Sequence, residues 1–122
     1  MSEIKQIEPK NWKTFLEEFS TRNNNRRARF DAYRRDGNAE EERAESHFET
    51  AFLKENGNKN DVVIVRIDRS KSDAEKTHDT ITNVVGISVQ YDTDGSEDAL
   101  QITDRENELI SLRFESKVDG VS

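Results

Sequence analysis

Residues 87–114 read ISVQYDTDGSEDALQITDRENELISLRF and carry the clearest pattern in the chain. Apolar side chains alternate with polar ones in three successive runs, which are Ile87, Val89 and Tyr91, then Leu100 and Ile102, then Ile110, Leu112 and Phe114. Such alternation is typical of a strand with one buried face, and the turn-rich segments between the runs can join neighbouring strands. The sequence therefore predicts an antiparallel meander in the last third of the chain.

An amphipathic helix is predicted near the start of the chain. Pro9 suits the first helical turn, where its missing N–H would have no intrahelical partner. The apolar side chains that follow share one stripe and are Trp12, Phe15, Leu16 and Phe19. We expect the helix to run from about Pro9 to Arg22 and to end at the asparagines 23–25, whose side chains compete with backbone hydrogen bonds.

The middle of the chain predicts further strands. Residues 27–35 alternate and lead into the turn sequence at 36–38, which indicates a strand entering a hairpin. Residues 39–56 fit both a helical stripe and an alternating pattern; we favour one or two strands, because the preceding turn needs a partner strand. Residues 62–67 are β-branched and apolar on both faces, which is typical of a central strand covered on both sides.

These patterns together predict an α+β fold. The N-terminal amphipathic helix packs on a mainly antiparallel meander sheet of five to seven strands in near-sequential order. We expect a single domain over 1–122, with a mobile loop near 69–80, where the sequence is charged and aperiodic, and a loose C-terminal tail at 116–122.

The composition limits the classes of function. Apolar residues make up 31% of the 122 residues, charged residues 37%, and the net charge is −7. No cysteine is present, which excludes disulfides, thiolate nucleophiles and cysteine-ligated metals. The opening MSEIKQIEPK lacks the apolar core of a signal peptide, so we expect a cytoplasmic protein.

Three segments resemble a family of small bacterial proteins, well represented in cyanobacteria, that is known as a domain of unknown function. They are IEPKNWKTFLEEFSTRNNNRRARF at 7–30, NDVVIVRID at 60–68 and TNVVGISVQYDTDGSEDALQITDRENELISLRF at 82–114. The resemblance implies a small cytoplasmic α+β domain with a hairpin in 39–56. It implies no activity and no site residues.

The candidate metal and acid–base residues favour structural interpretations. Asp92-Thr93-Asp94-Gly95 invites a calcium loop, but the first and twelfth positions of that loop would be Gln90 and Gln101, which are amides, so we favour a hairpin turn. His47 and His78 lie in charged surroundings, and we favour surface positions for both. We expect no cofactor, no metal and no catalytic residue.

The arginine-rich segment is the best functional candidate. Residues 1–36 carry a net charge of +3 and residues 37–122 a net charge of −10. The possible interaction surface comprises Arg22, Arg26, Arg27, Arg29, Tyr33 and Arg35, because guanidinium and aromatic groups together engage phosphates or carboxylates. The alternative, which we favour, is that the arginines pair across the hairpin with Glu40, Glu41, Glu42 and Glu45.

These observations predict a non-catalytic binding or protein-interaction module, with a protein as the expected partner. Nucleic-acid binding through Arg22–Arg35 is the second hypothesis, and the acidic balance of the chain disfavours it. A small hydrolase-like enzyme that uses histidine and carboxylates is the third. Salt dependence of binding separates the first two hypotheses, and His47 or His78 buried beside a carboxylate in a pocket would indicate the third.

Overall fold

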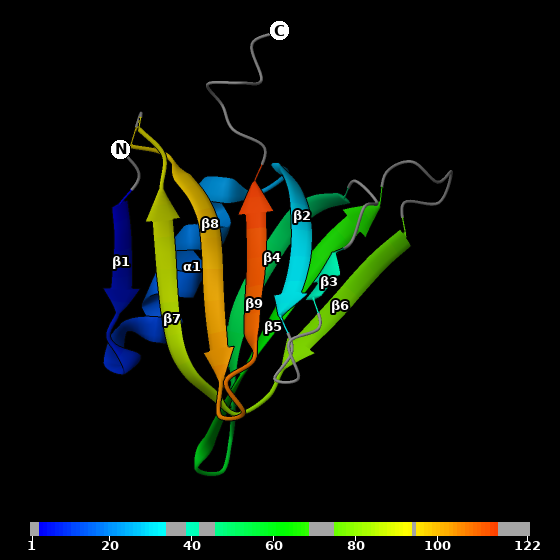
Figure 1. The fold of residues 1–122 in the computed structure, drawn as a ribbon. Coiled ribbons are helices and arrows are strands. Elements are labelled where there is room, and N and C mark those ends of the chain that lie inside the picture. Colours follow the sequence, from blue (N-terminus) through cyan, green and yellow to red (C-terminus); the bar gives the residue numbers. More distant parts are fainter. Residues whose placement is uncertain (1–2, 34–38, 42–45, 69–74, 94, 115–122) are drawn as a thin grey trace, which may run out of the picture.

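The computed structural model describes residues 3–33, 39–41, 46–68, 75–93 and 95–114. One helical segment and nine strands make up this part of the chain (Figure 1). The helical segment is a 3-10 turn, η1 (Pro9–Asn11), continuous with the α-helix α1 (Trp12–Asn23). The strands are β1 (Glu3–Ile7), β2 (Arg27–Tyr33), β3 (Ala39–Glu41), β4 (Ser46–Asn56), β5 (Lys59–Asp68), β6 (Glu75–Ile81), β7 (Val84–Tyr91), β8 (Glu97–Asp104) and β9 (Leu109–Phe114).

All strands belong to one antiparallel sheet. Eight of them follow the order β1-β7-β8-β9-β2-β4-β5-β6, and β3 pairs with β2 beside this path. The predicted α+β class and the C-terminal meander β7-β8-β9 are confirmed. The predicted five to seven strands in near-sequential order were wrong, because β1 pairs with β7 and β2 pairs with β9. Alternation along one strand does not encode these long-range pairings.

The sheet divides at β2. Arg27 and Ala28 at its start pair with β4, whereas Asp31–Tyr33 at its end pair with β3. The sheet thereby curls into two parts, β1-β7-β8-β9-β2 and β4-β5-β6, which lie one in front of the other in Figure 1. Their inner faces and α1 enclose one apolar core.

The helix supplies the centre of that core. Trp12, Leu16 and Phe19 are buried as the stripe predicts, while Phe15 is half-buried. The ring centroid of Phe19 lies 5.6 Å from that of Phe48 on β4 and 5.7 Å from that of Phe114 on β9. Phe19 therefore joins the two parts of the sheet.

The C-terminal end of α1 also covers an edge of β4. The Ser20 Oγ accepts a hydrogen bond from Ala51 N at 2.9 Å, and the Asn24 Nδ2 donates to Glu49 O at 2.8 Å. These contacts satisfy backbone groups of β4 beyond the point where β2 leaves it. The helix thus replaces a neighbouring strand there.

The middle of the chain matches the strand prediction in most places. Residues 39–56 contain two strands, β3 and β4, and β5 lies between β4 and β6 with Val62–Val65 buried. The loop predicted near 69–80 was wrong for its second half, because β6 pairs with β5 there. Residues 69–74 and the predicted tail at 116–122 lie outside the described residues.

Candidate functional site

Arg22 and Arg26 belong to the predicted interaction surface, and both contact Glu97 at the start of β8. The Arg22 guanidinium donates to both carboxylate oxygens, at 2.8 Å from Nε and 2.9 Å from Nη2. Asn23 Nδ2 donates to the same carboxylate at 2.9 Å, and Arg26 Nη1 donates to Glu97 O at 2.6 Å. These hydrogen bonds hold the C-terminal end of α1 against the start of β8.

The ionisation of Glu97 reflects this environment. Burial acts to raise the pKa of Glu97, but hydrogen bonds from Arg22 and Asn23, together with the charges of Arg22 and Arg26, lower it below its ordinary value of 4.5. The same bond to Glu97 raises the pKa of Arg22. Glu97 therefore stays ionised at neutral pH.

The remaining candidates lie on β2. Arg27, Arg29 and Tyr33 alternate with the core residues and are exposed on the outer face of the sheet. Arg29 lies opposite Arg113 of β9, and the buried Asp31 approaches their Nε atoms to 3.6 and 3.8 Å. Arg35, Glu42, Glu45 and the side chains of Glu40 and Glu41 lie outside the described part, so hairpin pairing of these residues stays a prediction.

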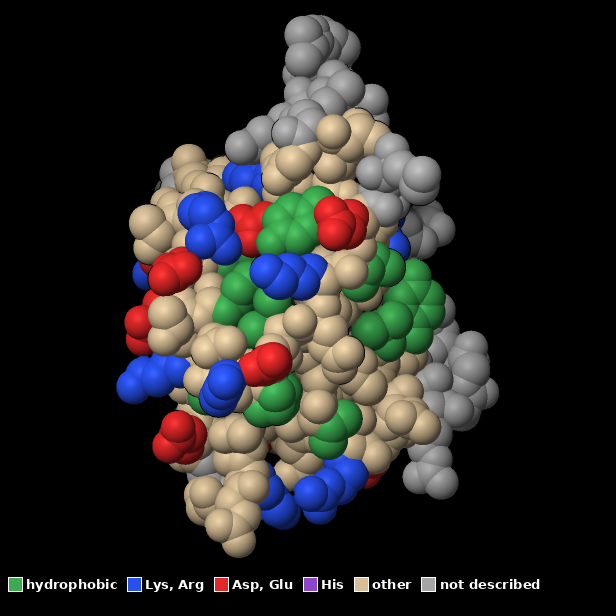
Figure 2. All heavy atoms as spheres, turned by 90° about the vertical axis from the view of Figure 1, so that its left-hand side faces the viewer, with side chains coloured by type: hydrophobic (Ala, Val, Ile, Leu, Met, Phe, Trp, Pro, Cys, Tyr) green, Lys and Arg blue, Asp and Glu red, His purple; other side chains and the backbone are tan. Residues whose placement is uncertain are grey.

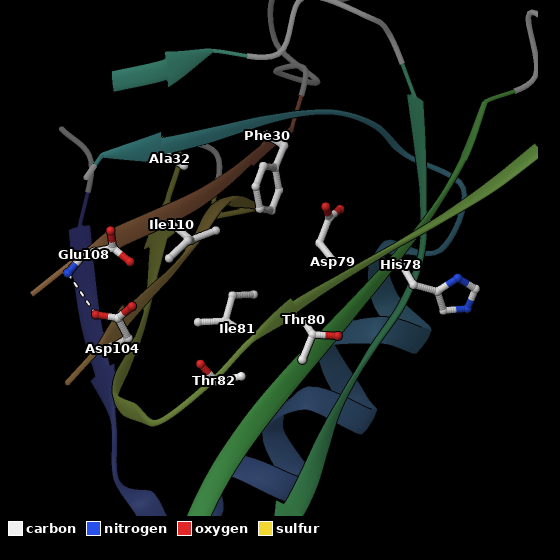
Figure 3. A pocket seen from close by; sticks show the side chains of 10 residues that line it. All are labelled: Phe30, Ala32, His78, Asp79, Thr80, Ile81, Thr82, Asp104, Glu108 and Ile110. Carbon is white, nitrogen blue, oxygen red and sulfur yellow. Dashed lines mark hydrogen bonds between the residues drawn. The ribbon is translucent and has the colours of Figure 1, made fainter. Parts of the chain in front are cut away.

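The two histidines lie on β4 and β6, apart from the acidic turn that joins β7 to β8. His47 is half-buried on β4, and His78 is exposed on β6 with its ring directed away from the neighbouring pocket (Figure 3). Asp92 and Gly95 belong to the turn between β7 and β8, where Gly95 N donates to Asp92 O at 3.0 Å and Gly95 has φ +86°. Among the described residues, no cluster of three metal-ligating side chains occurs.

A pocket of about 300 Å³ opens between β6 and the facing strands β2 and β9 (Figure 3). Its apolar lining consists of Phe30, Ala32, Ile81 and Ile110. Its polar lining consists of His78, Asp79, Thr80, Thr82, Asp104 and Glu108. The lining thus combines apolar contact surface with polar groups that can orient a bound partner.

The position of the pocket follows from β6 being the last strand of the sheet. Among the described strands, β6 pairs only with β5, so its other edge is open. The five consecutive residues 78–82 all border the pocket, although successive side chains of a strand point to opposite faces. The pocket therefore runs along the open edge of β6, and we call it the β6 slot.

A buried ion pair lies beside the β6 slot. The side chain of Arg66 is only 3% exposed, and its guanidinium contacts Asp79 Oδ2 at 2.8 Å and lies 4.8 Å from the centre of the Phe30 ring. Arg66 Nη1 also donates to Ser46 Oγ at 3.3 Å. These contacts hold Phe30 and Asp79, both lining residues, in place. This pair was not predicted from the sequence; its signal is that Arg66 falls on the same face of the strand as the buried Val62 and Ile64.

The charges around the β6 slot are mainly negative. Asp79, Asp104 and Glu108 line it, and none of its described lining residues is a lysine or arginine. Asp104 Oδ1 accepts hydrogen bonds from the backbone N–H groups of Glu106 and Glu108, both at 2.9 Å, which fixes the turn between β8 and β9. On the side of the molecule that carries β1, by contrast, acidic and basic side chains are interleaved around small apolar patches (Figure 2).

Comparison with protein-family models, curated proteins and solved structures finds no match to this chain. No described helix has the length and apolar character needed to span a bilayer.

Proposed function

We propose that this chain is a non-catalytic binding domain and that its partner occupies the β6 slot. The observation that carries the proposal is the slot itself, a recess with both apolar and acidic lining residues along the open edge of the last strand. Strand edges offer unpaired backbone groups to a partner, and an adjacent apolar recess can accept its side chains.

The contacts of the polar residues support binding over catalysis. Asp79 is held by Arg66, and Asp104 is held by the backbone of its own turn. His78 turns away from the slot, and His47 does not line it. A general base needs a partner within hydrogen-bond reach in a cleft, and neither histidine of this chain is placed beside a carboxylate in the slot.

The arginines give nucleic-acid binding less support. Arg22 and Arg26 are bound to Glu97, and Asp31 lies between Arg29 and Arg113. The net charge of −7 also repels a phosphate backbone at long range.

Selection of random peptides displayed on phage, with the immobilised full chain as bait, tests the proposal. Thr82→Trp places a large ring at an exposed position of the slot, and Thr21→Trp makes the same change on the exposed face of α1. We expect enriched peptides to bind the wild type and Thr21→Trp, and to bind Thr82→Trp about tenfold more weakly or not at all. Absence of enrichment, or binding that Thr82→Trp leaves unchanged, would overturn the proposal.

A further inference from the structure

We propose that the occupant of the β6 slot is an extended basic peptide segment of another protein, which adds to β6 as a further strand. This inference rests on the proposed function and names the chemistry of the partner.

The backbone edge favours an extended segment. β6 is seven residues long and ends the strand order, so a peptide laid beside it can form a ladder of main-chain hydrogen bonds. Five consecutive residues, 78–82, line the slot along this edge and just past the end of β6. A contact of this length suits an extended segment better than a single side chain. Its volume of about 300 Å³ suits a few side chains of a short segment.

The facing wall favours a peptide with alternating side chains. Phe30, Ala32 and Ile110 form that wall, and all three belong to the inner face of β2 and β9. In an added strand, every second side chain would point toward this wall and the others toward solvent. The stacking of Arg66 on Phe30 keeps the aromatic wall in position.

The charge of the slot favours basic residues in the partner. Asp79, Asp104 and Glu108 contribute three carboxylates to the lining, and the Asp79 carboxylate pairs with Arg66. Asp79 lies on the core-facing side of β6, and an inward charge at an edge disfavours pairing with a further strand unless that strand tolerates the charge. A lysine or arginine of the partner adds positive charge to a slot whose described lining residues include three acidic side chains and no lysine or arginine, and the net charge of −7 attracts a basic segment at long range.

A second copy of this chain fits the slot less well. A second β6 has two acidic residues and one lysine. It would therefore bring no excess of positive charge to the first β6. The other open edge of the described sheet is β1. Its Lys5 lies opposite Val89, so this edge carries a positive charge on the core-facing side. The acidic edge at β6 is thus the one that selects a basic partner.

Fluorescence anisotropy with labelled synthetic heptapeptides tests the inference on the full chain. The probes are an alternating lysine–valine peptide, an alternating glutamate–valine peptide, and two lysine–valine peptides that are N-methylated at alternate residues along one edge or the other. We expect the lysine–valine peptide to bind and the glutamate peptide to bind at least about tenfold more weakly. One of the two N-methylated peptides should lose binding and the other retain it, because an added strand uses only one of its edges for β6.

Variants locate the binding and its charge dependence. Glu108→Gln should weaken binding of the lysine–valine peptide several-fold at low salt and much less at high salt, whereas Glu17→Gln on the exposed face of α1 should not change it. Equal binding of both charge types, or equal tolerance of both N-methylated peptides, would overturn the inference. If phage-selected peptides still occupied the slot in that case, the proposed function would stand and only the identity of the partner would fall. A dimer in sedimentation that Thr82→Trp abolishes would overturn it in favour of a second copy.

Discussion

Arg66 on β5 donates two hydrogen bonds to one carboxylate oxygen of Asp79 on β6, at 3.1 Å from Nε and 2.8 Å from Nη2. The guanidinium is almost fully buried, while the Asp79 side chain is 25% exposed. Removing one partner of a buried pair leaves a charge without compensation, whereas replacing both by apolar groups is often neutral. Loss of either partner alone should therefore lower the stability of the fold and disturb the lining of the β6 slot.

We expect Asp79→Leu to lower the free energy of unfolding by about 3 kcal/mol, the low end for a broken buried pair because Asp79 is partly exposed. The double variant Arg66→Met with Asp79→Leu should recover most of this loss. Urea denaturation followed by circular dichroism measures both. If the single and double variants lost the same stability, the charge of Arg66 would not be the cause.

Phe19 should be more costly to truncate than Phe15 on the same helix. It is fully buried and contacts rings of β4 and β9, so Phe19→Ala should cost about 3–5 kcal/mol. Phe15 is only partly buried, and Phe15→Ala should cost clearly less. Urea midpoints of the two variants decide this, and a larger loss for Phe15→Ala would contradict the packing described.

Ser20 should stabilise the fold by accepting a hydrogen bond from a backbone N–H at the edge of β4. Its Oγ lies 2.7 Å from Leu16 O and 2.9 Å from both Ala51 O and Ala51 N. Ser20→Ala leaves a buried N–H without a partner, and we expect a loss of about 1–3 kcal/mol. Thr21→Ala is the matched control, since the Thr21 hydroxyl bonds Glu17 O at an exposed position. Hydrogen exchange of Ser20→Ala gives a second measurement. If the Ala51 amide lost less protection against exchange than the other amides of β4, this role of Ser20 would be contradicted.

Periodicity predicted those elements whose buried faces are apolar. The helix, β2, the central strand β5 and the meander all have such faces and were recognised in the sequence. β6 was missed because its core-facing Asp79 is satisfied by Arg66, so the strand lacks an alternating apolar pattern. β1 was missed because only Ile7 of its five residues is buried. A polar pair on adjacent strands, or a strand with few buried residues, thus escapes detection by periodicity.

The candidate site was less predictable than the fold, because its contacts join distant parts of the chain. Arg22 and Glu97 are 75 residues apart in the sequence, and no local pattern shows that they meet. The β6 slot depends on the divergence of β4 from β2 and on the open edge of β6, which follow from the strand order. Strand order is set by tertiary packing, which a single sequence does not reveal.

Glu97 should make the stability of this protein depend on acidity. Its pKa in the folded state is lowered below 4.5, so the folded protein favours the ionised carboxylate more than the unfolded chain does. The stabilisation is present above the unfolded pKa and is lost as the pH falls through the lower folded value. At pH 7, Glu97→Gln should cost on the order of 1 kcal/mol, because the Arg22 side chain is 46% exposed and screened by solvent.

The difference between wild type and Glu97→Gln should therefore shrink as the pH is lowered from 7 to below the ordinary value of 4.5. Urea midpoints of both proteins at several pH values measure it, and Glu18→Gln serves as the control because Glu18 is an exposed partner of Arg22 at 3.7 Å. That control should leave the pH dependence of the midpoint nearly unchanged, since an exposed pair contributes little. A gap between wild type and Glu97→Gln that stayed constant from pH 7 to pH 3 would show that the Glu97 carboxylate is not held by Arg22 and Asn23 in solution.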